Sequence, residues 1–158
     1  MSFLVLFALS WAVFYLFVDF QRLRELYPCA LVASLLGIIT DLVMLKFQLW
    51  GYHTPLVPAL YIPLVLDSSI YPVTAVLFTQ YLPLRRNRLV KFGYIVAWSL
   101  PSVLLEWTFL LRDEMQHYRW WTLWHSFFAD LIIFFILYGI HLLVRPYFRS
   151  SRSGEVSQ

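Results

Sequence analysis

Residues 117–146 read HYRWWTLWHSFFADLIIFFILYGIHLLVRP. The stretch begins with a cluster of tryptophans, ends with an arginine and a proline, and is almost entirely apolar between them. About 20 consecutive apolar residues are enough to cross a bilayer, so this stretch predicts a membrane-spanning helix. One acid, Asp130, interrupts it. An acid inside an apolar run is costly in lipid and generally has a partner or a function.

Four further apolar runs precede this one, and they decide the class of protein. The chain has 158 residues, of which 61% are hydrophobic and 13% are charged, whereas a soluble domain is nearer half apolar and a quarter charged. We predict an all-α membrane protein, a bundle of five transmembrane helices at about residues 2–19, 28–47, 59–82, 91–111 and 120–144. Residues 1–146 then form a single integral membrane domain, with no room for a separate soluble one.

Two features refine this scheme. Pro63 and Pro72 fall within the third run, where we expect kinks rather than a break, because neighbouring groups in a bundle can satisfy the carbonyls that proline leaves free. The tail, residues 147–158, is polar and rich in serine. That composition predicts a disordered cytoplasmic tail.

The basic residues predict the orientation, because lysine and arginine collect in cytoplasmic loops. Nine of them fall on one side of a five-span bundle: Arg22, Arg24, Arg85, Arg86, Arg88, Lys91, Arg145, Arg149 and Arg152. Only Lys46, Arg112 and Arg119 fall on the other. We therefore predict an outer N-terminus and a cytoplasmic C-terminus. Five tryptophans are predicted to mark the outer membrane surface: Trp50, Trp107, Trp120, Trp121 and Trp124.

The densest basic segment is RRNRLVK, residues 85–91. Its cations are Arg85, Arg86, Arg88 and Lys91. We interpret them chiefly as a topology signal, compatible with contact to anionic lipid headgroups. Nucleic acid is not an expected partner for so short a segment between two membrane helices.

One acid lies on each of four predicted helices. These are Asp41, Asp67, Glu106 and Asp130. At about 1.5 Å per residue, all four fall in the outer half of the bilayer, roughly 8–14 Å deep. His125 lies one turn above the last of them. Small and hydroxyl residues share helix faces with the acids, which favours close helix packing. We therefore predict a polar cavity formed by the four acids and His125.

The acids allow three interpretations, which the sequence leaves open. They can hold the bundle together by pairing with hydroxyls, indole N–H groups or cations. They can bind or transport a proton or another cation, as intramembrane carboxylates often do. They can also ligate a metal in a membrane enzyme, because Asp, Glu and His are metal ligands. The chain lacks the short catalytic signatures of hydrolases and metalloproteases, so we predict no enzyme activity and no cofactor, and leave metal binding open.

The C-terminal third resembles a known family. The resemblance rests on Tyr118, Trp121, Trp124, Ser126, Asp130, His141 and Pro146, together with Leu26-Tyr27-Pro28 and Leu49-Trp50. These residues look like those of small uncharacterised multi-pass membrane proteins from spore-forming Firmicute bacteria. The resemblance implies a protein of the bacterial plasma membrane and implies no particular activity.

The expected partners follow from the same features. The lipid bilayer is the first of them. A second copy of the chain is compatible with five short helices that enclose little volume. The alternative to a binding or transport function is an accessory subunit that contacts another membrane protein through its aromatic outer rim.

Overall fold

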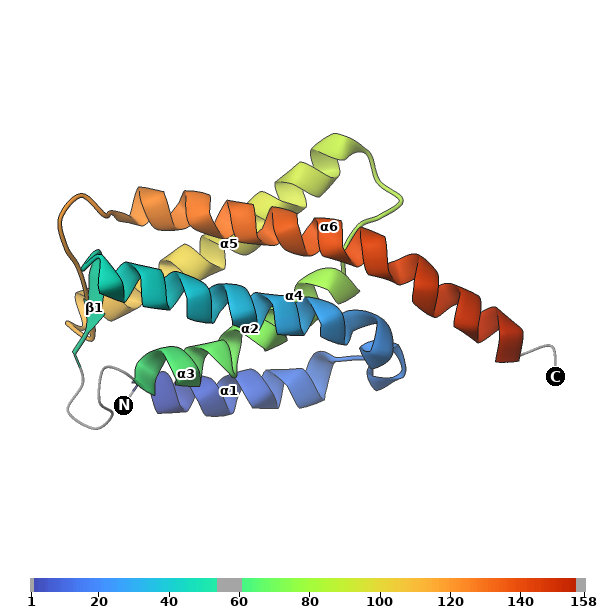
Figure 1. Ribbon diagram of the computed structural model, residues 1–158, viewed down its shortest axis with the longest axis horizontal. Helices are drawn as coiled ribbons and strands as arrows, with labels where there is room; N and C mark the ends of the chain where they lie inside the picture. Colours follow the sequence, from blue (N-terminus) through green and yellow to red (C-terminus); the bar gives the residue numbers. More distant parts are fainter. Residues whose placement is uncertain (1, 54–60, 156–158) are drawn as a thin grey trace.

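The computed structural model describes residues 2–53 and 61–155, with side chains described over 3–53 and 61–148. Its elements are α1 (Ser2–Phe17), the 3-10 helix η1 (Phe20–Arg22), α2 (Leu23–Lys46), β1 (Trp50–Tyr52), α3 (Ile62–Asp67), α4 (Ile70–Gln80), α5 (Arg88–Leu111), β2 (Met115–His117) and α6 (Leu123–Glu155). The helices lie lengthwise in one bundle, with the two short strands at one end (Figure 1).

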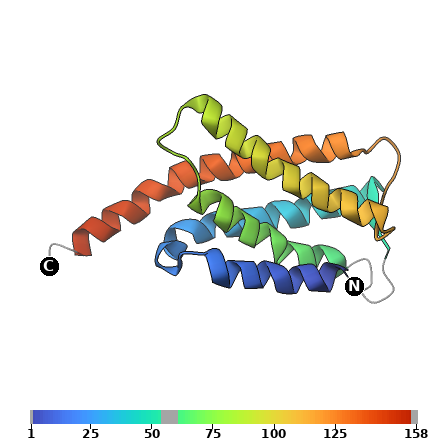
Figure 2. The same ribbon diagram turned by 180° about the vertical axis from the view of Figure 1, so that it is seen from behind.

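The chain passes along the bundle in alternating directions. The N-terminus and the two strands lie at one end, whereas the turns after α1 and α4 lie at the other (Figure 2). Helix α2 packs against α4 and α6, and α6 also packs against α5. The predicted arrangement of apolar helices as a bundle is confirmed.

Four helical segments of the described chain are long and apolar enough to cross a membrane. They are Phe20–Lys46, Ile62–Gln80, Arg88–Leu111 and Leu123–Phe148. Helix α1 is also apolar but has only 16 residues, which at 1.5 Å per residue gives about 24 Å, less than the roughly 30 Å of a hydrocarbon core.

The third predicted span is broken rather than kinked. Helix α3 ends at Asp67, and α4 begins at Ile70 after a two-residue turn. Pro72 contributes to the break, because it lacks an N–H for the carbonyl of Ser68 and its ring crowds that carbonyl. The Ser69 hydroxyl donates a hydrogen bond of 2.6 Å to the carbonyl of Val65. The prediction of a kink without a break was therefore wrong, although Ile62–Gln80 as a whole remains long and apolar enough to cross a membrane as one span.

The last helix is longer than predicted. It continues through Pro146 to Glu155, so residues 147–155 are helical where the sequence predicted a disordered tail; residues 156–158 lie outside the described chain. The helix continues past Pro146 because a single proline removes only one helical hydrogen bond. No glycine, which would favour a helix end, follows until Gly154. Helix α2 also begins earlier than predicted, at Leu23, and contains Pro28.

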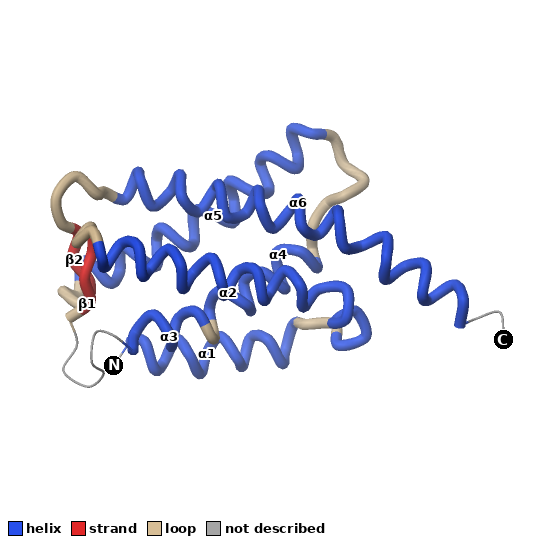
Figure 3. Tube along the Cα trace, in the orientation of Figure 1, coloured by secondary structure: helices blue, strands red, loops and turns tan. Residues whose placement is uncertain are grey.

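The two strands were predicted as loops. They pair antiparallel, with Trp50 opposite His117, Gly51 opposite Gln116 and Tyr52 opposite Met115. Figure 3 shows the strands crossing the end of the bundle between α2 and α5. Their apolar side chains pack with Phe3, Phe109 and Trp121 in a core cluster at this end. The sheet therefore places polar groups of β1 and β2 next to the acids of the helices.

Candidate functional site

Asp41 is a buried acid bound by two aromatic donors. Its side chain is 2% exposed. Trp50 Nε1 donates to Asp41 Oδ1 over 3.1 Å, and the Tyr52 hydroxyl donates to the same oxygen over 2.9 Å. Burial raises the pKa of Tyr52 well above its ordinary value, so the phenol keeps the proton that it donates. Asp41 thus fastens β1 to α2.

Glu106 receives a second set of donors. Its Oε1 accepts a hydrogen bond of 2.6 Å from the Ser126 hydroxyl and lies 2.6 Å from His117 Nε2. Trp121 Nε1 in turn donates to the Ser126 hydroxyl over 2.9 Å. Glu106 thereby joins α5 to β2 and to α6. No described residue donates a hydrogen bond to its second oxygen.

Asp67 lies at the break between α3 and α4 and is 1% exposed. Both carboxyl oxygens are buried and have no hydrogen-bond partner among the described residues. The carboxyl group fits against the bare backbone of Gly37 on α2, where an added Cβ would stand only 3.1 Å from Asp67 Cγ and nearer still to Oδ1. The Ser34 hydroxyl donates over 2.6 Å to the main-chain carbonyl of Asp67, which fixes α3 to α2 at this point.

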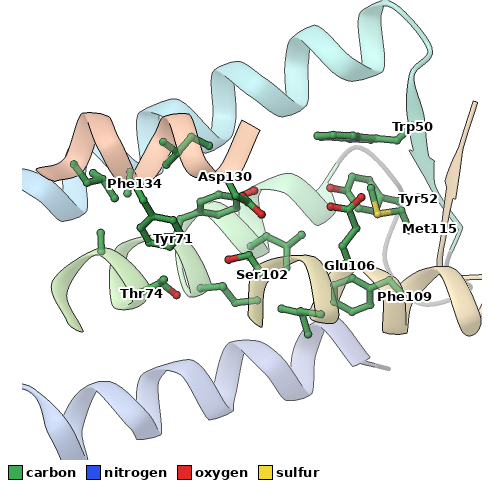
Figure 4. A pocket seen from close by; sticks show the side chains of 17 residues that line it. Trp50, Tyr52, Tyr71, Thr74, Ser102, Glu106, Phe109, Met115, Asp130 and Phe134 are labelled. Atoms are coloured by element: carbon green, nitrogen blue, oxygen red, sulfur yellow. The ribbon is translucent and has the colours of Figure 1, made fainter. Parts of the chain in front are cut away.

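A cavity of about 110 Å³ lies between the helices. Asp130 of α6 and Glu106 of α5 both line it (Figure 4), together with the hydroxyl groups of Tyr71, Thr74 and Ser102. Asp130 makes no hydrogen bond or ion pair with any residue that the structure describes. Its carboxyl group therefore faces the cavity without a donor among the described residues, whereas Asp41 and Glu106 have donors.

The cavity is large enough for several water molecules, because one water needs roughly 10–15 Å³ of such volume. Its oxygen atoms could solvate a proton carried by water or a small monovalent cation. Over residues 2–53 and 61–155, no group of three or more His, Cys, Asp or Glu side chains is placed to hold a metal ion. Among the described residues that line the cavity, Glu106 and Asp130 carry the carboxyl groups that a cation can contact.

The structure places the predicted site residues in three positions: lining the cavity, beside it, and away from it. Glu106 and Asp130 share the cavity. Asp41 and Asp67 lie beside it without lining it, although Tyr71 is within electrostatic range of all four carboxyl groups.

His125, the fifth predicted member, lies elsewhere. It is exposed on the first turn of α6. There its Nδ1 is 2.9 Å from the Thr122 hydroxyl, and its ring packs on Trp120 and Trp121. The cavity lining does not include it.

Sequence reasoning missed several polar members of the site. The predicted site did not include Tyr71, although its spacing of four from Asp67 puts it on the same helical face. Tyr52 and His117 were assigned to loops, and only the pairing of β1 with β2 brings them to their acids. No local signal in the sequence predicts a pairing between segments 65 residues apart.

The predicted tryptophan belt is only partly at the surface. Trp107, Trp120 and Trp124 are exposed. Trp50 and Trp121 are buried, and their rings pack edge to face with centroids 5.5 Å apart. Their indole N–H groups serve the acid network instead of the membrane surface.

The long apolar helices define the class of protein: this chain is a helical integral membrane protein. In this protein, the intramembrane acids lie between the helices and the two-stranded sheet of β1 and β2. Comparisons with protein-family models, curated proteins and solved structures give no match for the chain.

Proposed function

We propose that the chain is a small integral membrane protein whose cavity binds a proton or a small monovalent cation during transport across the membrane. Asp130 is the primary binding group and Glu106 the second. The carrying observation is the carboxyl group of Asp130, which faces a cavity of about 110 Å³ without a hydrogen bond from any described residue. An intramembrane carboxyl group without a partner is costly, so such residues are rare and generally mark functional sites.

The broken span supports this proposal. Discontinuous helices near the bilayer midplane recur at the ion sites of membrane transporters, because their ends offer backbone groups to the ion. Here the break at Ser68–Ser69 follows Asp67 directly, and Tyr71 and Thr74 of α4 line the cavity one turn further on. The break thus lies beside the proposed site.

We further propose five spans, with the N-terminus outside and the C-terminus in the cytoplasm of a bacterial cell. The alternating passes of the helices along the bundle support five spans (Figure 1). Helix α1 is then a short first span, which at about 24 Å requires local thinning of the bilayer. The excess of arginine and lysine at the end opposite the strands supports the orientation. The resemblance to small multi-pass proteins of spore-forming Firmicutes supports the bacterial plasma membrane.

The proposal is tested by ion flux in proteoliposomes. Purified protein is reconstituted, and proton, sodium and potassium fluxes are followed separately with ion-sensitive dyes under an imposed gradient. The wild type is expected to exceed empty liposomes for at least one of these ions, and Asp130→Asn to abolish the excess. Asp113→Asn is the matched control, because Asp113 is an exposed acid in the turn after α5 and its positive φ of 54° suits asparagine. Equal flux in wild type and empty liposomes for all three ions contradicts transport.

A second function is favoured by a different observation. Asp41 and Glu106 already interact with side chains of β1, β2 and α6. This is expected if the acids serve only to hold the bundle together. In that case the protein would be an accessory subunit, and the exposed Trp107, Trp120 and Trp124 would contact another membrane protein. Loss of thermal stability in Asp130→Asn, with no flux in the wild type, would favour this alternative.

A further inference from the structure

A concavity of about 980 Å³ lies at the end of the bundle opposite the strands. Five arginines line it: Arg22, Arg24, Arg85, Arg86 and Arg145. They come from three separate segments, namely the start of α2 with η1, the turn between α4 and α5, and the last third of α6. Figure 1 shows these segments, coloured blue, green and red, together at this end. The fold therefore gathers cations that are up to 123 residues apart.

Among the residues whose side chains are described, the lining holds one carboxylate, Glu25. Its Oε1 lies 3.8 Å from an Arg22 nitrogen and 3.6 Å from Arg145 Nε. The buried His141 ring is also close, with Nε2 3.7 Å from the same oxygen. Glu25 therefore forms ion pairs with two of the five arginines that line the concavity.

The remaining arginines are not matched by acids. Arg24, Arg85 and Arg86 are exposed, and their guanidinium groups make no hydrogen bond or ion pair with the residues that the structure describes. Five guanidinium groups against one carboxylate leave a strong excess of positive charge. The complementary ligand is an anion.

The shape and chemistry specify the anion further. A guanidinium group presents N–H donors in a planar fork that matches two oxygens of a phosphate. The volume is in the range of ligand pockets, roughly 300–1,000 Å³. Phe20, Leu82 and Leu84 also line the concavity, which suits a ligand with an apolar part. The concavity also adjoins the ends of the apolar helices α2, α4 and α5, because its lining includes Arg24, Gln80 and Arg85.

We propose that this concavity, named here the arginine pocket, binds the phosphate group of an anionic ligand. A phospholipid headgroup and a free phosphate share this chemistry, and the apolar lining favours the lipid. The sequence grouped Arg85 and Arg86 with Arg88 and Lys91 as one basic segment, but only the first two line the pocket. This inference is independent of the acid cavity.

Because only two of the four basic residues in segment 85–91 line the pocket, this segment offers a matched pair of variants. The full-length protein in detergent is titrated with phosphatidylglycerol or with phosphatidylcholine of the same acyl chains, and bound lipids are counted by native mass spectrometry. The wild type is expected to bind phosphatidylglycerol at least tenfold more tightly. Arg85→Gln/Arg86→Gln is expected to lose about tenfold or more of that affinity, since each basic residue near an anionic lipid contributes substantially. Arg88→Gln/Lys91→Gln removes the same charge and is expected to lose less than twofold.

Two further arms identify the source of the phosphate and guard against misfolding. Displacement of the lipid by millimolar inorganic phosphate would assign the site to free phosphate, whereas resistance to it would assign the site to the headgroup. Arg24→Gln, an exposed single change, repeats the test if the double variant fails to fold. Equal affinity for the two lipids, or equal losses in the two double variants, would overturn the proposal.

Discussion

The environment of each acid differs, although the sequence presents all four alike. Asp41 and Glu106 accept hydrogen bonds, Asp67 is enclosed against a glycine, and Asp130 faces the cavity. The sequence predicted that the acids would face other helices. It could not rank them, because the donors that distinguish them come from β1, β2 and the start of α6.

Gly37 tests the packing of Asp67. Alanine at this position would place a Cβ against the carboxyl group, so we expect Gly37→Ala to lower the free energy of unfolding by about 1–3 kcal/mol, the usual cost of overpacking. Gly93→Ala is the matched helical control, because nothing lies within 4 Å of its added Cβ. It is expected to be neutral or to stabilise by up to about 1 kcal/mol. Thermal unfolding in detergent measures both, and equal effects would contradict the packing.

Tyr52 tests the hydrogen bond to Asp41 and gives the protein a dependence on alkaline pH. Its pKa is raised in the fold, so the folded protein keeps the proton at pH values where the unfolded chain releases it. The stability that Tyr52 contributes is therefore complete below the ordinary tyrosine pKa of about 10 and is lost as the pH rises through the folded value. We expect Tyr52→Phe to lower stability by about 1–3 kcal/mol at neutral pH and to flatten the decline above pH 10. An unchanged alkaline decline would count against this role.

At the scale of elements, the sequence predicted the long helices well and the short features poorly. Long apolar runs identify α2, α5 and α6 because each is a local property of the chain. The break at Ser68–Ser69 depends on how Pro72 is compensated by its surroundings. The strand pairing depends on two distant segments meeting across the end of the bundle. Neither property can be read from local periodicity.

A cross-link tests the strand pairing. Gly51 and Gln116 lie directly opposite each other, and paired residues in antiparallel strands have Cα atoms about 4.5–5.5 Å apart, within reach of a disulfide. An added Cβ at Gly51 would lie 3.0 Å from the exposed Tyr118 ring, which has room to turn away. We expect Gly51→Cys/Gln116→Cys to form an intramolecular disulfide under mild oxidation, seen as a mobility shift in a nonreducing gel. Gly51→Cys/Lys91→Cys, whose second position is on the first turn of α5, is expected to remain reduced. Cross-linking in both variants or in neither would contradict the register.

At the scale of the whole molecule, charge is separated along the bundle. The arginine pocket lies at one end, and the acids lie nearer the strands at the other. The sequence predicted this separation from the basic residues of the loops and from the estimated depth of the acids along their helices, but it assigned the basic residues to separate loops. Only the folded chain shows that arginines from three segments line one concavity.

The proposed orientation is tested by cysteine labelling in intact cells. Asp113→Cys, in the turn before β2, is expected to react with a membrane-impermeant maleimide added outside. Arg86→Cys, at the opposite end, is expected to react only after the membrane is permeabilised. The native Cys29 is buried and should contribute little background. The reverse pattern would invert the topology and place the arginine pocket outside.

The central claim is that Asp130 binds the transported ion while Asp41 holds the structure together. The most direct test compares Asp130→Asn and Asp41→Asn in one preparation, with ion flux and thermal unfolding measured on each. The account predicts that Asp130→Asn abolishes flux and leaves the unfolding temperature close to that of the wild type, because no described hydrogen bond is lost. Asp41→Asn is expected to lower the unfolding temperature through its weakened bonds to Trp50 and Tyr52. Wild-type flux in folded Asp130→Asn would contradict the account.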